Sequence, residues 1–112
     1  MALSGLSERM TDTVRLCAVQ AAPALFDKQA SLDIALEWID RAAKEKPDVI
    51  AFGEAWLPGY PFFIDSPLSD TWWAAASELL KNGVRLDGPE VEALCKAAKQ
   101  AGSDLVIGVN EL

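Results

Sequence analysis

Glu54 is the residue whose type and position first suggest chemistry. It follows the apolar run 48–52, which is short enough and apolar enough to predict a buried strand. In open parallel sheets, ligands bind in the crevice outside the carboxyl ends of the strands. Phe52, Trp56 and Leu57 flank Glu54, and burial among such groups disfavours the charged form of a carboxyl group. This environment would suit a general base that works near neutrality.

A second interpretation of Glu54 remains open from local features alone. Its carboxylate could accept hydrogen bonds from loop amides and hold a proline-rich turn. Pro58, Gly59 and Pro61 would fix the loop in either case. Glu111, with Asn110 beside it, follows the last apolar run at the same expected end of the sheet, so an acid–base pairing with Glu54 is a further hypothesis.

The residue types that are missing or isolated exclude several kinds of chemistry. The 112 residues contain no histidine, which excludes Ser-His-Asp and Cys-His catalysis and most zinc sites within this chain. Cys17 and Cys95 each sit among apolar neighbours, where a thiol behaves as a small hydrophobe. The segment 21–24 lacks the glycines of a dinucleotide-binding loop. We therefore predict no metal and no cofactor.

The elements that must position Glu54 begin with a predicted strand–helix–strand unit. Residues 14–20 form a short apolar run, and apolar residues recur at helical spacing from Ser31, a plausible N-cap, until Pro47 ends the helix. The run 48–52 follows at once. A helical crossover between two strands implies that they pair in parallel.

The second half of the chain predicts a long loop, two helices and one more strand. Residues 53–69 are irregular and rich in proline and aromatic residues, which is typical of a functional loop. A helix is predicted over 70–82 with Ser69 as its N-cap, and another from Pro89 to a C-cap at Gly102. A third strand is predicted over 105–109.

This pattern predicts an α/β fold with three mainly parallel strands and three helices. The helices can cover at best one face of such a sheet, although parallel strands are normally covered on both. We expect residues 1–12 to be a flexible leader and residues 13–112 to form an incomplete domain.

The charge and hydropathy of the chain argue against nucleic acid and membranes as binding partners. The chain carries 17 acidic and 10 basic residues, a formal charge of −7, and no basic run, which argues against binding to nucleic acid. It has neither a secretory signal nor 18 consecutive apolar residues, so no membrane association is predicted and a reduced, cytoplasmic location is expected.

The run Phe-Gly-Glu-Ala-Trp-Leu-Pro-Gly-Tyr-Pro at 52–61 closely resembles the glutamate motif of the nitrilase, or carbon-nitrogen hydrolase, superfamily. Other segments agree in order and spacing, so the resemblance spans about residues 13–112. These segments are 14–23, Trp72-Trp73, 88–91 and 106–111. The extended Trp-Leu-Pro-Gly-Tyr-Pro form is more similar to the nitrilase branch than to the amidase or carbamoylase branches.

The resemblance implies the N-terminal part of an α-β-β-α sandwich and a Glu-Lys-Cys mechanism that converts small nitriles to a carboxylic acid and ammonia. Glu54 would be the general base, with Tyr60 and Glu111 as candidate substrate-binding residues; Tyr60 could equally be a packed aromatic that stiffens the loop. The lysine and Cys-Trp-Glu motifs of the family do not occur here, so we expect this chain alone to be inactive. The complete enzyme is expected to form homo-oligomers.

A non-catalytic alternative remains. A short α/β chain with a bare sheet edge and an uncovered sheet face could act by associating with a partner, because unpaired strand groups and apolar surface favour association.

Overall fold

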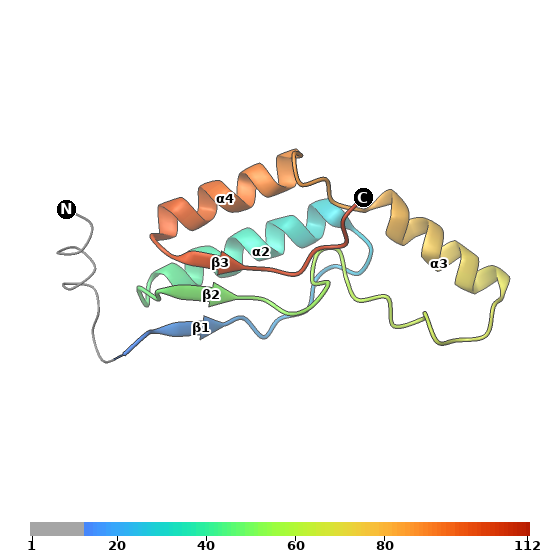
Figure 1. The fold of residues 1–112 in the computed structure, drawn as a ribbon, viewed down its shortest axis with the longest axis horizontal. Coiled ribbons are helices and arrows are strands. Elements are labelled where there is room, and N and C mark those ends of the chain that lie inside the picture. The colour runs from blue at the N-terminus through green and yellow to red at the C-terminus, as the bar shows by residue number, and fades with distance from the viewer. Residues whose placement is uncertain (1–12) are drawn as a thin grey trace.

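The computed structural model describes residues 13–112, and the expected leader at 1–12 lies outside the described residues. The described chain is an α/β fold (Figure 1). Its elements are, in order, β1 (Leu16–Ala18), α2 (Lys28–Ala43), β2 (Val49–Ala51), α3 (Asp70–Lys81), α4 (Pro89–Ala101) and β3 (Asp104–Val106).

The three strands form one parallel sheet in the order β1-β2-β3, which confirms the predicted fold class. Each strand is shorter than its predicted apolar run. Pairing continues just beyond the strand ends, where the Val19 amide donates to the Ala51 carbonyl at 2.8 Å and the Phe52 amide donates to the Val106 carbonyl at 2.8 Å. The apolar runs are longer than the strands because residues such as Phe52 remain buried in the core after the strand has ended.

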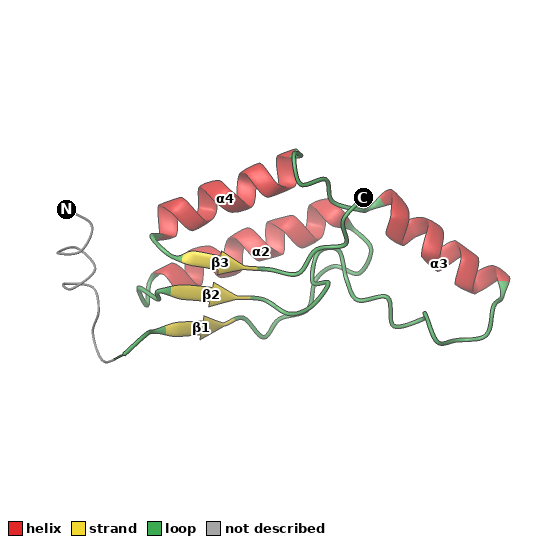
Figure 2. Ribbon diagram, viewed as in Figure 1, coloured by secondary structure: helices red, strands yellow, loops and turns green. Residues whose placement is uncertain are grey.

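In the part of the chain that the structure describes, helices cover one face of the sheet, as predicted, because α2 and α4 lie on the same side of it (Figure 2). Ile50 of β2 is fully buried, and its register partners Cys17 and Leu105 are half-buried on that same face. Side chains of neighbouring strand positions point to opposite faces. Leu16 and Val106 are accordingly 63% and 56% exposed on the open face.

The start of α2 differs from the prediction. The helix begins at Lys28, one turn before the expected position, and its N-cap is Asp27, whose carboxylate accepts a hydrogen bond from the Ala30 amide at 3.0 Å. Ser31 lies inside the first turn, where its hydroxyl donates to the Ala24 carbonyl at 2.7 Å. The prediction was wrong because the first turn is polar and the apolar repeat starts only after it.

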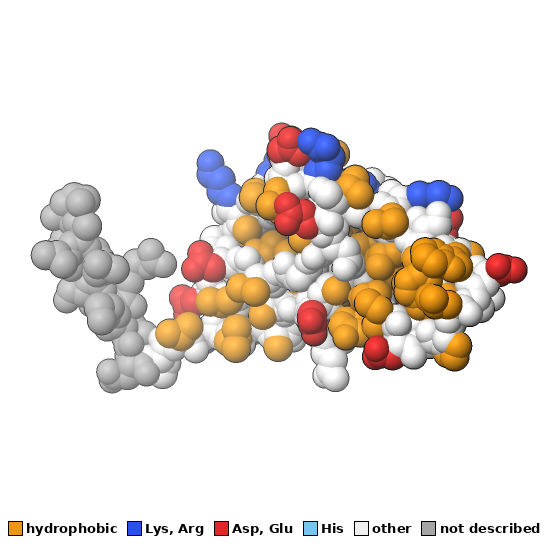
Figure 3. Space-filling view, turned by 45° about the vertical axis from the view of Figure 1, so that its right-hand side comes forward, with side chains coloured by type: hydrophobic (Ala, Val, Ile, Leu, Met, Phe, Trp, Pro, Cys, Tyr) orange, Lys and Arg blue, Asp and Glu red, His pale blue; other side chains and the backbone are white. Residues whose placement is uncertain are grey.

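The other two helices lie where the sequence predicts them. Ser69 caps α3 by accepting from the Trp72 amide at 3.1 Å, and Gly102 ends α4 in the left-handed conformation that glycine favours. None of the residues of α3 is buried, and this helix extends away from the sheet (Figure 1). Apolar side chains gather over α3 and the loop before it (Figure 3), and they include the exposed Leu68, Trp73 and Leu80.

Candidate active site

Glu54 lies at the carboxyl end of β2, the central strand, as the sequence predicts. The Gly53 carbonyl is the last group in line with the strand, and it accepts a hydrogen bond from the Gly108 amide at 3.2 Å. The chain then turns through residues 54–56. Ala55 has a φ of 47°, and the Gly59 amide donates to the Ala55 carbonyl at 3.1 Å to close the turn. We call residues 53–59 the Glu54 turn.

The residues on either side of Glu54 form the apolar base of the turn. Phe52 and Trp56 are both buried, with their rings packed edge to face at 4.9 Å. The indole N–H of Trp56 donates to the Ala21 carbonyl at 2.8 Å, which ties the turn to the segment after β1. Leu57 is fully buried.

Glu54 itself is exposed, so the expectation that its side chain is buried among these apolar groups is wrong. The neighbours pack beneath the end of the sheet, whereas the sharp turn leaves the carboxylate at the surface. An exposed carboxylate at the end of the central strand is open to a reacting group from outside this part of the chain.

The segment after β3 holds the Glu54 turn on one side. Leu57 and Val109 form a parallel bridge, in which the Leu57 amide donates to the Gly108 carbonyl at 3.1 Å. The Asn110 amide donates to the Leu57 carbonyl at 3.0 Å, and the Asn110 side-chain amide donates to the Gly59 carbonyl at 2.8 Å. Asn110 therefore positions the turn, a role that the sequence analysis did not find.

Gly108 allows the closest approach in the site. A Cβ atom at this position would lie 2.4 Å from the Ala55 amide nitrogen and 2.8 Å from the Gly53 carbonyl oxygen. No side chain fits at such distances. The glycine therefore lets the backbone after β3 lie directly against the backbone of the Glu54 turn. The sequence signal for this contact is a single glycine within an otherwise apolar strand run.

The other two predicted site residues are less closely tied to the turn. Tyr60 follows Gly59 directly and is 51% exposed. Glu111 is exposed, and its backbone pairs with Val84 in the connection between α3 and α4. Within residues 13–112, no hydrogen bond joins the Glu54 and Glu111 side chains, so the hypothesis of an acid–base pair gains no support from the geometry.

Neither a metal cluster nor a membrane-spanning helix occurs in the part of the chain that the structure describes. No three Cys, Asp or Glu side chains come together there as metal ligands would, and no helix there is long and apolar enough to cross a bilayer. A hollow of about 430 Å³ lies between α2 and α4, and one of about 570 Å³ between α4 and β3. Glu54 lines neither of them.

Comparison with known proteins gives a family match and several relatives. The family model described as carbon-nitrogen hydrolase matches residues 15–112. A protein named Nitrilase 2, from an unknown prokaryotic organism, is 46% identical over 99 residues, which are 88% of this chain and 32% of that protein. An arylacetonitrilase of Hypocrea virens is 38% identical over 98 residues, and an aliphatic nitrilase of Rhodococcus rhodochrous is 34% identical over 106. These matches cover 88% and 92% of this chain but only 29% and 27% of the two relatives, so the chain spans less than a third of the length of the proteins it matches.

Proposed function

The chain belongs to the carbon-nitrogen hydrolase family, and we propose that it forms the N-terminal part of a nitrilase-like enzyme in which Glu54 is the general base. The observation that carries this proposal is the Glu54 turn, which holds an exposed carboxylate at the end of the central parallel strand. Backbone hydrogen bonds from the segment after β3 fix the turn, so the backbone that carries Glu54 is held in place.

In the proposed reaction, Glu54 accepts the proton of a cysteine thiol, and the thiolate attacks the nitrile carbon to give a thioimidate. Glu54 then assists the attack of a first water, which releases ammonia and leaves a thioester, and of a second water, which releases the carboxylic acid and frees the thiol. A lysine stabilises the charge that develops on nitrogen. This division of labour is the one that the family resemblance implies.

We propose that the nucleophile and the lysine of this mechanism come from outside the described chain. Cys17 lies in β1 and Cys95 is on the surface of α4, so neither is at the Glu54 turn. The lysines of α3 and α4, which are Lys81, Lys96 and Lys99, are exposed on their helices. We therefore propose that this chain alone does not hydrolyse nitriles.

The substrate class follows from the names of the relatives. They are called arylacetonitrilase and aliphatic nitrilase, and we propose small organic nitriles for this chain as part of a complete enzyme. Tyr60, exposed six residues after Glu54, is the proposed contact with the organic group, and Glu111 is a second candidate. Homo-oligomers and a cytoplasmic location are part of the same proposal.

A first experiment tests the chain alone. The purified chain is incubated with a panel of aliphatic and aromatic nitriles, and released ammonia is measured. We expect no ammonia above the buffer control, because a general base without a nucleophile forms no thioimidate. Turnover by the chain would contradict the proposed division of labour.

A second experiment tests Glu54 directly. Residues 13–112 replace the matching segment of the 46% identical Nitrilase 2, and the chimaera is assayed with the same nitriles. We expect activity that Glu54→Gln lowers by at least about 10²-fold, because the amide keeps the shape but cannot accept the proton. Asp65→Asn, at another exposed acid of the irregular segment, is the matched control and should leave the rate unchanged. Equal rates for both variants would overturn the role of Glu54.

The non-catalytic alternative rests on the open face of the sheet, where Leu16 and Val106 are exposed. Under this alternative the chain acts by binding a partner, and the chimaera would be inactive even with Glu54 in place. The two functions therefore predict opposite results in the second experiment.

A further inference from the structure

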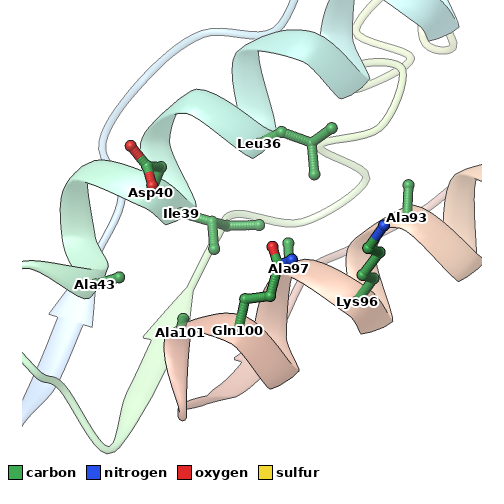
Figure 4. A pocket seen from close by; sticks show the side chains of 9 residues that line it. All are labelled: Leu36, Ile39, Asp40, Ala43, Ala93, Lys96, Ala97, Gln100 and Ala101. Carbon is green, nitrogen blue, oxygen red and sulfur yellow. The ribbon is translucent and has the colours of Figure 1, made fainter.

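The amino ends of α2 and α4 lie together at the carboxyl edge of the sheet (Figure 1). There the Lys28 ammonium group is 3.2 Å from the Glu90 carboxylate, and only 28% and 11% of the two side chains are exposed. Toward their carboxyl ends the same helices leave the hollow of about 430 Å³ between them, which Ile39 and Ala97 help to line (Figure 4). The ion pair therefore joins the helices at the end that is nearest to the Glu54 turn.

The start of α2 is also bound directly to the Glu54 turn. The Phe26 amide donates to the Pro58 carbonyl at 2.9 Å. Pro58 and Gly59 are buried, and a Cβ atom on Gly59 would lie 2.7 Å from Cδ1 of Leu25, so the chain before α2 lies against the turn. A shift of the start of α2 would therefore shift the turn as well.

Lys28 attaches the start of α2 to the connection between α3 and α4. Its ammonium group donates to the Gly83 carbonyl at 3.2 Å, and its backbone amide donates to the Asn82 side-chain oxygen at 3.0 Å. The backbone amide of the first residue of a helix has no acceptor within its own helix, so Asn82 satisfies a donor that would otherwise be unpaired. Two hydrogen bonds from one residue thus fix the distance between α2 and this connection.

The connection is bonded in turn to the segment after β3. The amide of Val84, which is fully buried, donates to the Asn110 carbonyl at 2.8 Å. The Asn110 side chain donates to the Gly59 carbonyl at 2.8 Å. Hydrogen bonds and short chain segments therefore form a closed ring, which runs from the Glu54 turn through the start of α2, Lys28, residues 83–84 and Asn110 back to the turn.

We propose that Lys28 is a positioning residue for Glu54, because its side chain closes this ring and so holds the two supports of the Glu54 turn at a fixed separation. The inference rests on the proposed role of Glu54 as general base. A general base must lie within hydrogen-bond reach of the proton that it accepts, and a misplacement of about 1 Å can lower a rate by about 10²-fold. Glu90 holds the ammonium group in its mostly buried place by its opposite charge.

Two variants separate positioning from stability. Lys28→Met leaves the Glu90 carboxylate buried without a partner and removes the bond to Gly83, so both stability and rate should fall. The double variant Lys28→Met, Glu90→Leu contains neither charge and should recover most of the stability, but the bond to Gly83 is still missing. In the chimaera with Nitrilase 2, we expect the double variant to have a kcat at least about tenfold below that of the parent chimaera. KM should change less than about threefold, because Glu54 acts on the thiol proton and not on the bound nitrile.

Two further variants of the chimaera serve as controls. Lys81→Met removes the same charge from the exposed pair with Glu78 and should leave kcat unchanged. Lys28→Arg keeps a cation for Glu90 and a donor for the Gly83 carbonyl, and it should retain more of the rate than the double variant. A double variant whose kcat recovers together with its stability would overturn the proposal, because Lys28 would then only stabilise the fold. An unchanged kcat in Lys28→Met would overturn it as well.

Hydrogen exchange in the full chain tests the ring without any turnover. The Leu57 and Gly59 amides of the turn should exchange at least about tenfold faster in the double variant than in the wild type, because a broken ring lets the turn open locally. The Val19 and Phe52 amides, which donate to carbonyls of neighbouring strands, should exchange at unchanged rates. Equal acceleration of all four amides, or of none, would contradict the role of Lys28.

The two kinds of measurement distinguish failure of this inference from failure of the proposed function. If Glu54→Gln leaves the chimaera fully active, Glu54 is not the base, whatever the exchange rates show. If Glu54→Gln abolishes activity and the double variant exchanges and turns over like its parent, the base stands and Lys28 does not position it.

Discussion

The position of Glu54 depends on a residue that has no side chain. Gly108 lies so close to the Glu54 turn that a Cβ atom would come within 3.0 Å of three backbone atoms of residues 53–55. Together with the hydrogen bonds of Asn110, this contact makes the segment after β3 the support of the turn. The geometry of the proposed base is therefore set by residues more than 50 positions away in the sequence.

We expect Gly108→Ala to destabilise the chain by about 1–3 kcal/mol, because the added methyl group must push the two backbone segments apart. The free energy of unfolding can be measured by urea titration. Gly53→Ala is the matched control: its Cβ would meet only the Trp56 ring, at an ordinary 4.0 Å, and we expect a change within about 0.5 kcal/mol. Equal losses for the two variants would contradict the close contact.

For a single residue such as Glu54, the sequence predicts the position in the fold better than the exposure of the side chain. The strand run before Glu54 was sufficient to place it at the carboxyl end of β2, because a short apolar run that follows a helical crossover ends at that edge. Its exposure could not be predicted, since burial depends on how sharply residues 54–56 turn. The role of Asn110 was equally hidden, because its hydrogen bond to Gly59 spans 51 positions.

At the scale of elements, one ion pair connects the start of α2 to the start of α4. The Lys28 ammonium group lies 3.2 Å from the Glu90 carboxylate and also donates to the Gly83 carbonyl at 3.2 Å. Glu90 is buried to all but 8% of its surface. The neighbouring Val84 pairs with the backbone of residues 110–112, so this connection also borders the support of the Glu54 turn.

Replacing Lys28 with Met should cost about 2–4 kcal/mol, because it leaves the Glu90 carboxylate buried without its partner. The double variant Lys28→Met, Glu90→Leu should recover most of this loss, which a thermodynamic cycle from urea titrations measures. Lys81→Met breaks the exposed pair with Glu78 and serves as the control, with an expected cost below about 1 kcal/mol. A double variant no more stable than Lys28→Met would contradict the explanation by an unpaired charge.

Local chemistry at the helix ends decides which element boundaries can be predicted from the sequence. The ends of α3 and α4 were predictable because Ser69, Pro89 and Gly102 mark them by local chemistry. The start of α2 was not, because the first turn, Lys28-Gln29-Ala30, carries no apolar repeat and Ser31 imitates a cap. Strand lengths were overestimated because an apolar run records burial, and burial extends beyond the backbone pairing at Phe52.

At the scale of the whole molecule, the described chain has one covered and one open sheet face. Ile50 packs beneath the helices, while Leu16 and Val106 remain exposed on the other side. Family membership over residues 15–112, together with the short share of each relative that is matched, indicates that relatives contain much more chain than this sheet and its helices.

The open face predicts association that surface substitutions can remove without loss of stability. Leu16→Thr with Val106→Thr should reduce scattering from particles larger than the single chain, because exposed apolar strand surface favours non-specific contacts and threonine keeps the preference for strand. The free energy of unfolding should change by less than about 1 kcal/mol, since both side chains are already more than half exposed.

Ile50→Thr is the control on the covered face: it places a hydroxyl group and a smaller side chain in the fully buried position and should cost about 2–4 kcal/mol. If the double variant scatters as strongly as the wild type while its stability is unchanged, the large particles do not form through the open face.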